Sequence, residues 1–257
     1  MSLPSPAELL TFAEDIALQA GEITLQYFGA RVEHQEKGDG TPVTLADRAA
    51  EEALRRRITE RYPEHGILGE EFGEKPGRAP VRWILDPIDG TRSFMRGVPL
   101  YAVLIGVEVE GEPVVGVAHF PGLSETVAAA RGQGCRWNGR PCGVSSQAEL
   151  GKALVLTTDP VMARRSAVGE GWDRLSAACE YTRSWGDAYG HALVATGRAE
   201  VMVDPELSSW DSAPLLTILT EAGGRFTDVK GRATIHGGSG LSTNGILHEA
   251  ALAFLQD

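Results

Sequence analysis

The amino-acid sequence predicts an α+β protein in two parts, residues 1–145 and a smaller α/β part over residues 146–257. Two observations carry this prediction: helix patterns followed by short β-rich runs in the first part, and alternating strand and helix patterns in the second. A polar, glycine-containing stretch at residues 143–146 separates the two patterns. We therefore expect an antiparallel sheet with two covering helices, followed by a smaller α/β domain.

The first part should begin with two helices. Ser5 starts a capping box, with proline at the first helical position and glutamate three residues after the serine. Thr44 is the expected N-cap of the second helix, which places Asp47 in its first turn. The apolar stripe of this helix should start at Leu45, and a Tyr-Pro pair should stop the helix.

Short apolar runs in the first part predict strands at residues 67–68, 81–85, 101–109, 113–120 and 126–130. The turn at residues 110–112 joins two of these runs, and Asn138-Gly139 is a typical two-residue hairpin turn. Both turns favour antiparallel pairing. In the second part, strands are expected at residues 154–157, 200–203 and 225–228, with helices near 174, at 188–196 and at 209–222.

The composition narrows the classes of partner. The chain has 257 residues, a formal net charge of −11 and a pI near 5.1, and such an acidic surface repels nucleic acid and anionic membranes. Its longest apolar runs, such as residues 102–109, are much shorter than the about 20 residues of a membrane helix, and its beginning lacks a signal-peptide pattern. We expect a cytoplasmic protein without nucleic-acid or membrane partners.

The cysteine and histidine residues are scattered along the chain. Cys135, Cys142 and Cys179 form no CxxC pair, and no two histidines stand four residues apart. We therefore expect ordinary reduced thiols and no zinc site.

The most informative stretch is 81–91, where an apolar strand leads directly into Asp-Pro-Ile-Asp-Gly-Thr. The proline between Asp86 and Asp89 ends the strand ladder, and Gly90 lets the backbone approach a ligand. Thr91 offers both a hydroxyl and an N–H group to an anion. Side chains placed in this way at a strand end are typical of a functional site.

A second acidic pair, Glu70-Glu71, follows another short apolar strand. Carboxylates that meet in one cleft repel one another and rise in pKa unless cations neutralise them. An all-oxygen ligand set favours magnesium, manganese or calcium over zinc. A solvated acidic turn is the simpler alternative, and we accept it for Glu74 and Glu112.

Three other motifs fit this stretch less well. An EF-hand loop beginning at Asp86 needs glutamate at its twelfth position, which is Gly97 here. The Gly-Lys-Ser or Gly-Lys-Thr triplet of a P-loop is absent from the sequence. The D-x-D-x-T motif of haloacid dehalogenase phosphatases is closer, but two residues separate Asp86 from Asp89, which breaks the register of an aspartyl nucleophile.

Residues 83–91 resemble the W-x-x-D-P-I-D-G-T motif of the inositol monophosphatase family, and Glu70-Glu71 matches its upstream G-E-E element. Residues 210–213 and 221–224 resemble its W-D-x-A and E-A-G-G elements. The similarity covers nearly the whole chain, with the motifs in the same order.

This resemblance implies a layered α-β-α-β-α fold with the site between the two parts. It also implies two or three Mg²⁺ ions, a small phosphate monoester as substrate, and a homodimer. The implied metal ligands are Glu70, Asp86, the Ile88 carbonyl, Asp89 and Asp211. The N–H groups of Gly90 and Thr91 would bind phosphate oxygens.

The resemblance further implies that water attacks the phosphorus in line, without a phosphoenzyme. Glu70, together with Thr91 backed by Asp47, would orient and deprotonate that water. Asp47 has a simpler alternative role, because an acidic residue in the first turn stabilises a helix by itself.

Substrate preference is suggested by features that resemble the histidinol-phosphate phosphatase branch of the family, at residues 96–99, 183–189 and 204–206. Asp187, Asp204 and Glu206 would favour the ammonium and imidazole groups of histidinol phosphate over a neutral polyol. Arg183 would lie on the phosphate side.

Two of these assignments have structural alternatives. Asp187 is also a suitable N-cap for the helix at 188–196, with Arg183 pairing to it on the surface. The glycine-rich stretch 236–240 is better explained as a connector than as a substrate contact.

Three functions are consistent with the sequence. The first is a histidinol-phosphate phosphatase of histidine biosynthesis, and the second an inositol 1-phosphate or broad sugar-phosphate phosphatase. The third is a noncatalytic, metal-dependent regulatory protein that retains the fold. The intact set of Glu70, Asp86, Asp89, Thr91 and Asp211 argues against the third.

Overall fold

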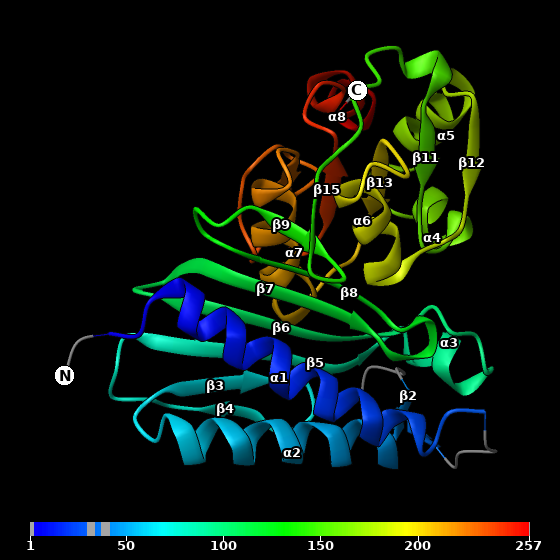
Figure 1. Ribbon diagram of the computed structural model, residues 1–257. Coiled ribbons are helices and arrows are strands. Elements are labelled where there is room, and N and C mark those ends of the chain that lie inside the picture. The colour runs from blue at the N-terminus through cyan, green and yellow to red at the C-terminus, as the bar shows by residue number, and fades with distance from the viewer. Residues whose placement is uncertain (1–2, 30–33, 37–41, 257) are drawn as a thin grey trace.

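The computed structural model describes residues 3–29, 34–36 and 42–256 (Figure 1). Within these residues, the larger sheet has eight strands in the order β10-β9-β8-β7-β6-β5-β3-β4. Its strands are β3 (Gly66–Gly69), β4 (Gly73–Lys75), β5 (Val81–Asp89), β6 (Ala102–Val109), β7 (Glu112–Phe120), β8 (Glu125–Ala130), β9 (Cys135–Trp137) and β10 (Arg140–Cys142). The predicted hairpin turn joins β9 to β10, with positive φ angles of 49° at Asn138 and 74° at Gly139.

One strand pair corrects the expectation of a wholly antiparallel sheet, because β3 and β5 run parallel. The chain leaves β3 through the edge strand β4 and re-enters the sheet on the other side of β3. Parallel pairing places the carboxyl ends of both strands at the same edge of the sheet. Since Gly69 lies opposite Leu85, the acidic residues Glu70 and Asp86 follow at that shared edge.

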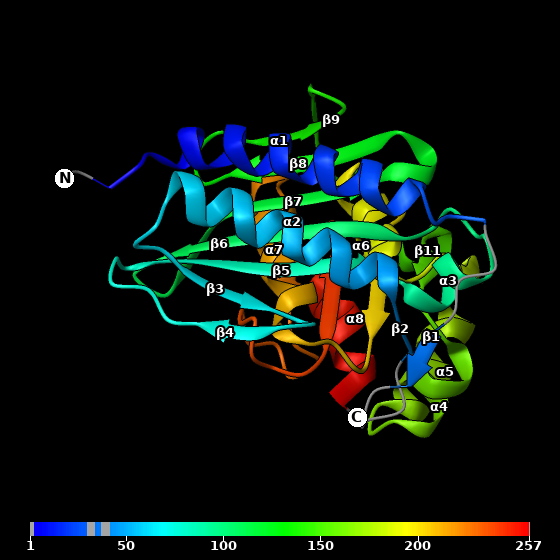
Figure 2. The same cartoon turned by 90° about the horizontal axis from the view of Figure 1, so that it is seen from below.

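The helices α1 (Pro6–Leu25) and α2 (Leu45–Arg61) cover one face of the larger sheet, and Figure 2 shows them lying across its strands. The predicted capping box forms at Ser5, and the predicted N-cap Thr44 also forms a capping box, with Asp47. Leu45 is 63% exposed, so it does not belong to the apolar stripe, which starts one residue later. The short strands β1 (His34–Glu36) and β2 (Pro42–Thr44) pair antiparallel just before α2.

The smaller sheet has, among the described residues, five strands in the order β12-β11-β13-β15-β14. They are β11 (Leu154–Leu156), β12 (Tyr181–Arg183), β13 (Val201–Asp204), β14 (Arg225–Thr227) and β15 (Gly240–Thr243). The remaining helices are α3 (Thr91–Met95), α4 (Pro160–Arg165), α5 (Gly169–Ala178), α6 (Asp187–Ala195), α7 (Ser209–Glu221) and α8 (His248–Gln256), and 3₁₀ turns occur at Pro121–Leu123 and Leu150–Lys152.

The elements form five layers, in the order α-β-α-β-α that the resemblance implies. Helices α6 and α7 lie between the two sheets, and α4, α5 and α8 lie beyond the smaller sheet (Figure 1). One hydrophobic core between the sheets joins Leu104 and Ala118 of the larger sheet to Leu156, Met202 and Leu215 of the second part. The division into domains at residue 146 therefore stays a prediction. No helix in the described ranges combines the length and apolar character that crossing a bilayer requires.

Two glycines let α7 lie directly against the larger sheet. Gly106 of β6 and Gly116 of β7 stand opposite each other, and both face α7. A Cβ atom at Gly116 would lie 2.1 Å from the Pro214 carbonyl oxygen, and one at Gly106 would lie 2.7 Å from the Ala213 Cβ. This close contact brings the first turn of α7, which carries Asp211, toward the end of β5.

Candidate metal centre and substrate cavity

The end of β5 is shaped so that its two aspartates can face one cleft. The β5–β6 register shifts between Asp86 and Asp89, and the Ile88 N–H donates to Asp86 Oδ1 over 2.9 Å. Gly90 then adopts a left-handed conformation, with φ of 80°, and starts the short helix α3. This irregular backbone turns the chain at the sheet edge, where Thr91 follows.

The first turn of α7 supplies the third aspartate. Asp211 closes a capping box, because its Oδ2 accepts the Ser208 N–H over 2.8 Å. Carboxylate oxygens of Asp86, Asp89 and Asp211 lie within 4.8 Å of one another. They line a cavity of about 250 Å³, hereafter the carboxylate cavity, whose lining also includes Glu70, Ile88, Gly90 and Thr91. All predicted metal ligands thus meet in one place.

Burial and neighbouring charges raise the pKa of the three aspartates that line this cavity. Burial and then the charges of Glu70 and Asp211 hold the pKa of Asp86 well above its usual value. Burial and then the charges of Asp187 and Asp211 do the same for Asp89. Burial is also the main cause that raises the pKa of Asp211 to about 7. A hard divalent cation would remove this repulsion and prefers such oxygen ligands, so the residues present fit Mg²⁺.

Glu70 lies on a turn whose backbone is hydrogen-bonded to a side chain of α2. The Glu51 side chain of α2 is fully buried and accepts the N–H groups of Glu71, over 2.8 Å, and Phe72, over 3.3 Å. A Cβ atom at Gly69 would lie only 2.0 Å from Glu51 Oε1, so any other residue at this position would displace the Glu51 carboxylate. Glu51 was not among the predicted site residues, although an acidic residue on the buried stripe of α2 could have indicated it.

Asp47 and Thr91 do not contact each other directly. Asp47 Oδ2 accepts the Thr44 N–H over 2.8 Å, which is compatible with the helix-start role offered as its simpler alternative. Its Oδ1 is buried without a hydrogen-bond partner among the described residues, and burial raises the pKa of this carboxyl, with a smaller contribution from Glu70. The Thr91 hydroxyl donates to the Ile88 carbonyl over 3.1 Å. The catalytic role of Asp47 therefore stays a prediction.

A second cavity of about 540 Å³ adjoins the first and shares Asp89, Asp187 and Asp211 with it. We call it the acidic cavity, because Asp204 and Glu206 also line it. Asp187 points toward Gly90, where a Cβ atom would lie 3.0 Å from Asp187 Oδ2. Burial, and then the charge of Asp204, raise the pKa of Asp187 to about 7.

Asp204 is more deeply placed than a simple substrate contact. Its side chain is 2% exposed, and its Oδ2 lies 3.3 Å from His191 Nε2, while its Oδ1 accepts the Thr158 N–H over 3.2 Å. Glu206, by contrast, is exposed at the rim. The two acidic residues therefore differ in how freely they can meet a ligand.

The structure does not bring Arg183 to either cavity. Arg183 ends the edge strand β12, where its side chain is exposed, donates to the Thr182 carbonyl and lies over the Tyr181 ring. Edge position and stacking direct it outward, and it is absent from the linings of both cavities, so its phosphate contact stays a prediction without support from this geometry. It also makes no ion pair with Asp187 among the described contacts, and Gly186 is the N-cap of α6.

Arg92 is the basic residue that lines both cavities instead. Its charge lowers the pKa of Asp187, against the larger effect of burial. Sequence analysis overlooked it, although it directly follows Thr91 of the motif. The glycine-rich stretch at 236–240 packs on Asp228, where a Cβ atom at Gly237 would lie 2.4 Å from the Asp228 Cβ, and lines neither cavity.

The whole chain is similar to known phosphatases. A histidinol-phosphatase of Chlorobaculum parvum is 47% identical over 90% of this chain and 90% of its own length. A histidinol-phosphatase of Mycobacterium tuberculosis is 40% identical, covering 96% of this chain and 97% of the relative. The solved structure of an IMPase from Thermotoga maritima is 28% identical with a TM-score of 0.88, covering 96% of each chain.

The family model described as the inositol monophosphatase family matches residues 5–257, nearly the entire chain. Together with the relatives, this match supports a phosphomonoesterase over the noncatalytic alternative. The chain is therefore a phosphatase that belongs to the inositol monophosphatase family.

Proposed function

We propose that this phosphatase is Mg²⁺-dependent and that its main substrate is histidinol phosphate, an intermediate of histidine biosynthesis. The observation that carries the proposal is the pair of adjoining cavities, one lined by carboxylates suited to a hard cation and one lined by Asp187, Asp204 and Glu206. The names of the histidinol-phosphatase relatives support the same substrate.

The carboxylate cavity would hold two or three Mg²⁺ ions. The proposed ligands are Glu70, Asp86, the Ile88 carbonyl, Asp89 and Asp211, all of which line it. The bound ions would supply charge neutralisation for the phosphoryl oxygens and a more acidic water. The Ile88 carbonyl already accepts the Thr91 hydroxyl, but a carbonyl oxygen has a second lone pair for a cation.

The chain's own groups would position the reactants for in-line attack by water. Glu70 and the Thr91 hydroxyl would orient the water and receive its proton, with Asp47 behind them. The N–H groups of Gly90 and Thr91 would donate to phosphate oxygens. Both residues line the cavity, and the left-handed turn at Gly90 would leave their N–H groups accessible from it. Arg92, at the border of both cavities, would add positive charge on the phosphate side.

Substrate choice would depend on the acidic cavity. Histidinol phosphate carries an ammonium and an imidazole group, and the carboxylates of this cavity offer both of them hydrogen-bond acceptors and negative charge. Glu206 is free to contact these groups because it is exposed at the rim. Asp204 would act through the field of its buried charge, since His191 and Thr158 occupy its oxygens.

The test compares Mg²⁺-stimulated phosphate release from L-histidinol phosphate, myo-inositol 1-phosphate and fructose 1,6-bisphosphate by kcat/KM. We expect histidinol phosphate to be preferred. A preference for inositol phosphate would favour the second candidate, an inositol or broad sugar-phosphate phosphatase, which the fold shared with the Thermotoga IMPase supports.

The metal assignment is tested separately with Asp89→Asn. This variant should lose turnover with every ester, whereas Asp173→Asn, which alters an exposed ion pair with Arg164, should keep it. Unchanged turnover in Asp89→Asn would show that the metal assignment is wrong.

Two further parts of the proposal are the assembly state, which rests on the family, and the location, which rests on the sequence. We propose a homodimer in the cytoplasm. Light scattering at several protein concentrations measures the assembly state, and a monomer at all concentrations would contradict the proposed homodimer.

A further inference from the structure

Two cysteines face each other across the β9–β10 hairpin, away from both cavities. Cys135 and Cys142 are paired residues in the antiparallel register, and their sulfur atoms lie 3.5 Å apart. The hairpin is held firmly: its turn is Asn138-Gly139, and the Glu221 carboxylate of α7 accepts the N–H groups of two residues just before β9. The two thiols are therefore kept in contact by backbone structure.

The two thiols differ in accessibility. Cys135 is 3% exposed and belongs to the core between the sheets, together with Leu219 and Ala222 of α7. Cys142 is partly exposed at the end of β10, so a reagent in solution can reach it. Reaction from solution should therefore begin at Cys142.

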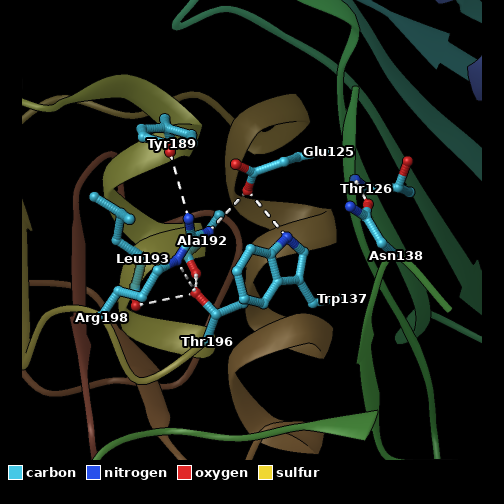
Figure 3. A network of polar contacts seen from close by, with 9 residues as sticks. All are labelled: Glu125, Thr126, Trp137, Asn138, Tyr189, Ala192, Leu193, Thr196 and Arg198. Atoms are coloured by element: carbon cyan, nitrogen blue, oxygen red, sulfur yellow. Dashed lines mark hydrogen bonds and ion pairs between the residues drawn. The ribbon is translucent and has the colours of Figure 1, made fainter. Parts of the chain in front are cut away.

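The surroundings of Cys142 favour its reactive thiolate form. The hydrogen bond between the two thiols is the main cause that lowers the pKa of Cys142, and the Arg198 guanidinium adds to this effect. Arg198 is held in place, as Figure 3 shows, by an ion pair with Glu125 of 2.9 Å, and it lies over the Trp137 ring at 4.2 Å. A fixed cation next to a partly exposed thiol is a typical setting for a reactive cysteine.

We propose that Cys135 and Cys142 form a redox modification site, which a low-molecular-weight disulfide such as glutathione disulfide oxidises reversibly to a cross-strand disulfide. For this bond to form, the sulfur atoms approach from 3.5 Å to the bonding distance of about 2.0 Å, between two residues that the hairpin register already pairs. The expectation of ordinary reduced thiols then holds for Cys179 and, under reducing conditions, for this pair.

The reaction consists of two exchange steps. The Cys142 thiolate attacks one sulfur of glutathione disulfide, so that a mixed disulfide forms, the glutathione S–S bond breaks and one glutathione thiolate leaves. Cys135 loses its proton to solvent and attacks the Cys142 sulfur, which forms the protein disulfide and releases the second glutathione thiolate. In total, two cysteine thiols are oxidised and one glutathione disulfide is reduced to two thiols.

The experiment treats the native protein with glutathione disulfide and follows free thiols and intact mass. In the wild type, we expect loss of two of the three thiols, a mass decrease of two hydrogen atoms and full recovery with dithiothreitol. Cys135→Ala should instead accumulate a stable glutathione adduct at Cys142. Cys142→Ser should leave Cys135 unreacted, since that thiol is buried.

Cys179→Ser serves as the control, because Cys179 packs against a different core cluster, that of Trp172 and Leu175, and this variant should behave like the wild type at the other two positions. A persistent adduct on wild-type Cys142, or retention of both hairpin thiols in the wild type, would overturn the proposal. Equal oxidation of Cys135 in the wild type and in Cys142→Ser would overturn the assigned order of attack. The partly exposed position of Cys142 makes loss of folding in Cys142→Ser unexpected.

Discussion

The contact between α7 and the larger sheet should control the geometry of the carboxylate cavity. In Gly116→Ala, the added Cβ atom would lie 2.1 Å from the Pro214 carbonyl oxygen, and ordinary contact begins at 3.4 Å. Restoring that contact requires α7 to move away from β7 by about 1.3 Å. Asp211 lies three residues before Pro214 on the same helix, so it should move away from Asp86 and Asp89.

A displacement of this size should be large in kinetic terms. Misplacing a functional group by about 1 Å costs on the order of 100-fold in rate, so we expect kcat/KM to fall by roughly 10- to 100-fold. The concentration of Mg²⁺ needed for half-maximal activity should rise, because the ligands move apart. Overpacking should also lower the free energy of unfolding by about 1–3 kcal/mol.

The assay measures phosphate release as a function of Mg²⁺, together with urea unfolding, at a temperature where both proteins are fully folded. Gly151→Ala is the matched control, because the nearest atom to its new Cβ would be 3.9 Å away. This control should resemble the wild type in both measurements. If Gly116→Ala kept the wild-type kcat/KM and Mg²⁺ dependence, the tight seat of α7 would not be what positions Asp211.

Further predictions concern the other groups of the site. In Glu51→Gln, the side chain loses the ion pair with Arg55 and one of the two oxygens that accept N–H groups below Glu70, so kcat/KM should fall roughly tenfold and the Mg²⁺-free stability should fall as well. Unchanged kinetics would show that Glu51 does not hold this turn. Glu206→Gln should raise KM for histidinol phosphate about three- to tenfold but leave kcat and the kinetics with inositol phosphate unchanged. Glu112→Gln is the surface control. Equal effects on both esters would contradict a role of Glu206 in recognition. The pKa values of Asp187 and Asp211 are both near 7, above the usual 3.8. Between these two pH values, the metal-free folded state therefore binds more protons than the unfolded state. The contribution of these groups to the metal-free stability should therefore fall as pH rises from about 4 to 7. The increase in Tm that Mg²⁺ causes should then be larger near pH 8 than near pH 5.5. An increase in Tm that does not depend on pH would refute this linkage.

Local chemistry explains which features the sequence alone could predict. The capping boxes at Ser5 and Thr44 and the hairpin turn at Asn138-Gly139 depend on residues within three positions of one another, so neighbouring side chains are enough to specify them. The same holds for the strand that ends in Asp86 and Asp89. The family motifs then predicted the layered fold, because their order along the chain is part of the pattern.

Tertiary packing decided the features that depend on distant parts of the chain. Parallel pairing of β3 with β5 put Glu70 beside Asp86, and burial on α2 placed Glu51 beneath that turn. Arg183 and Arg92 show the difference most clearly: both are basic residues near predicted site motifs, but an edge strand turns Arg183 outward while α3 leaves Arg92 at both cavities. The sequence by itself determined which side chains could hold a cation, because that is a property of residue type and local turn. Only the tertiary structure decided which of them meet, because their distances depend on strand pairing and on the close seat of α7, neither of which is encoded within one short segment.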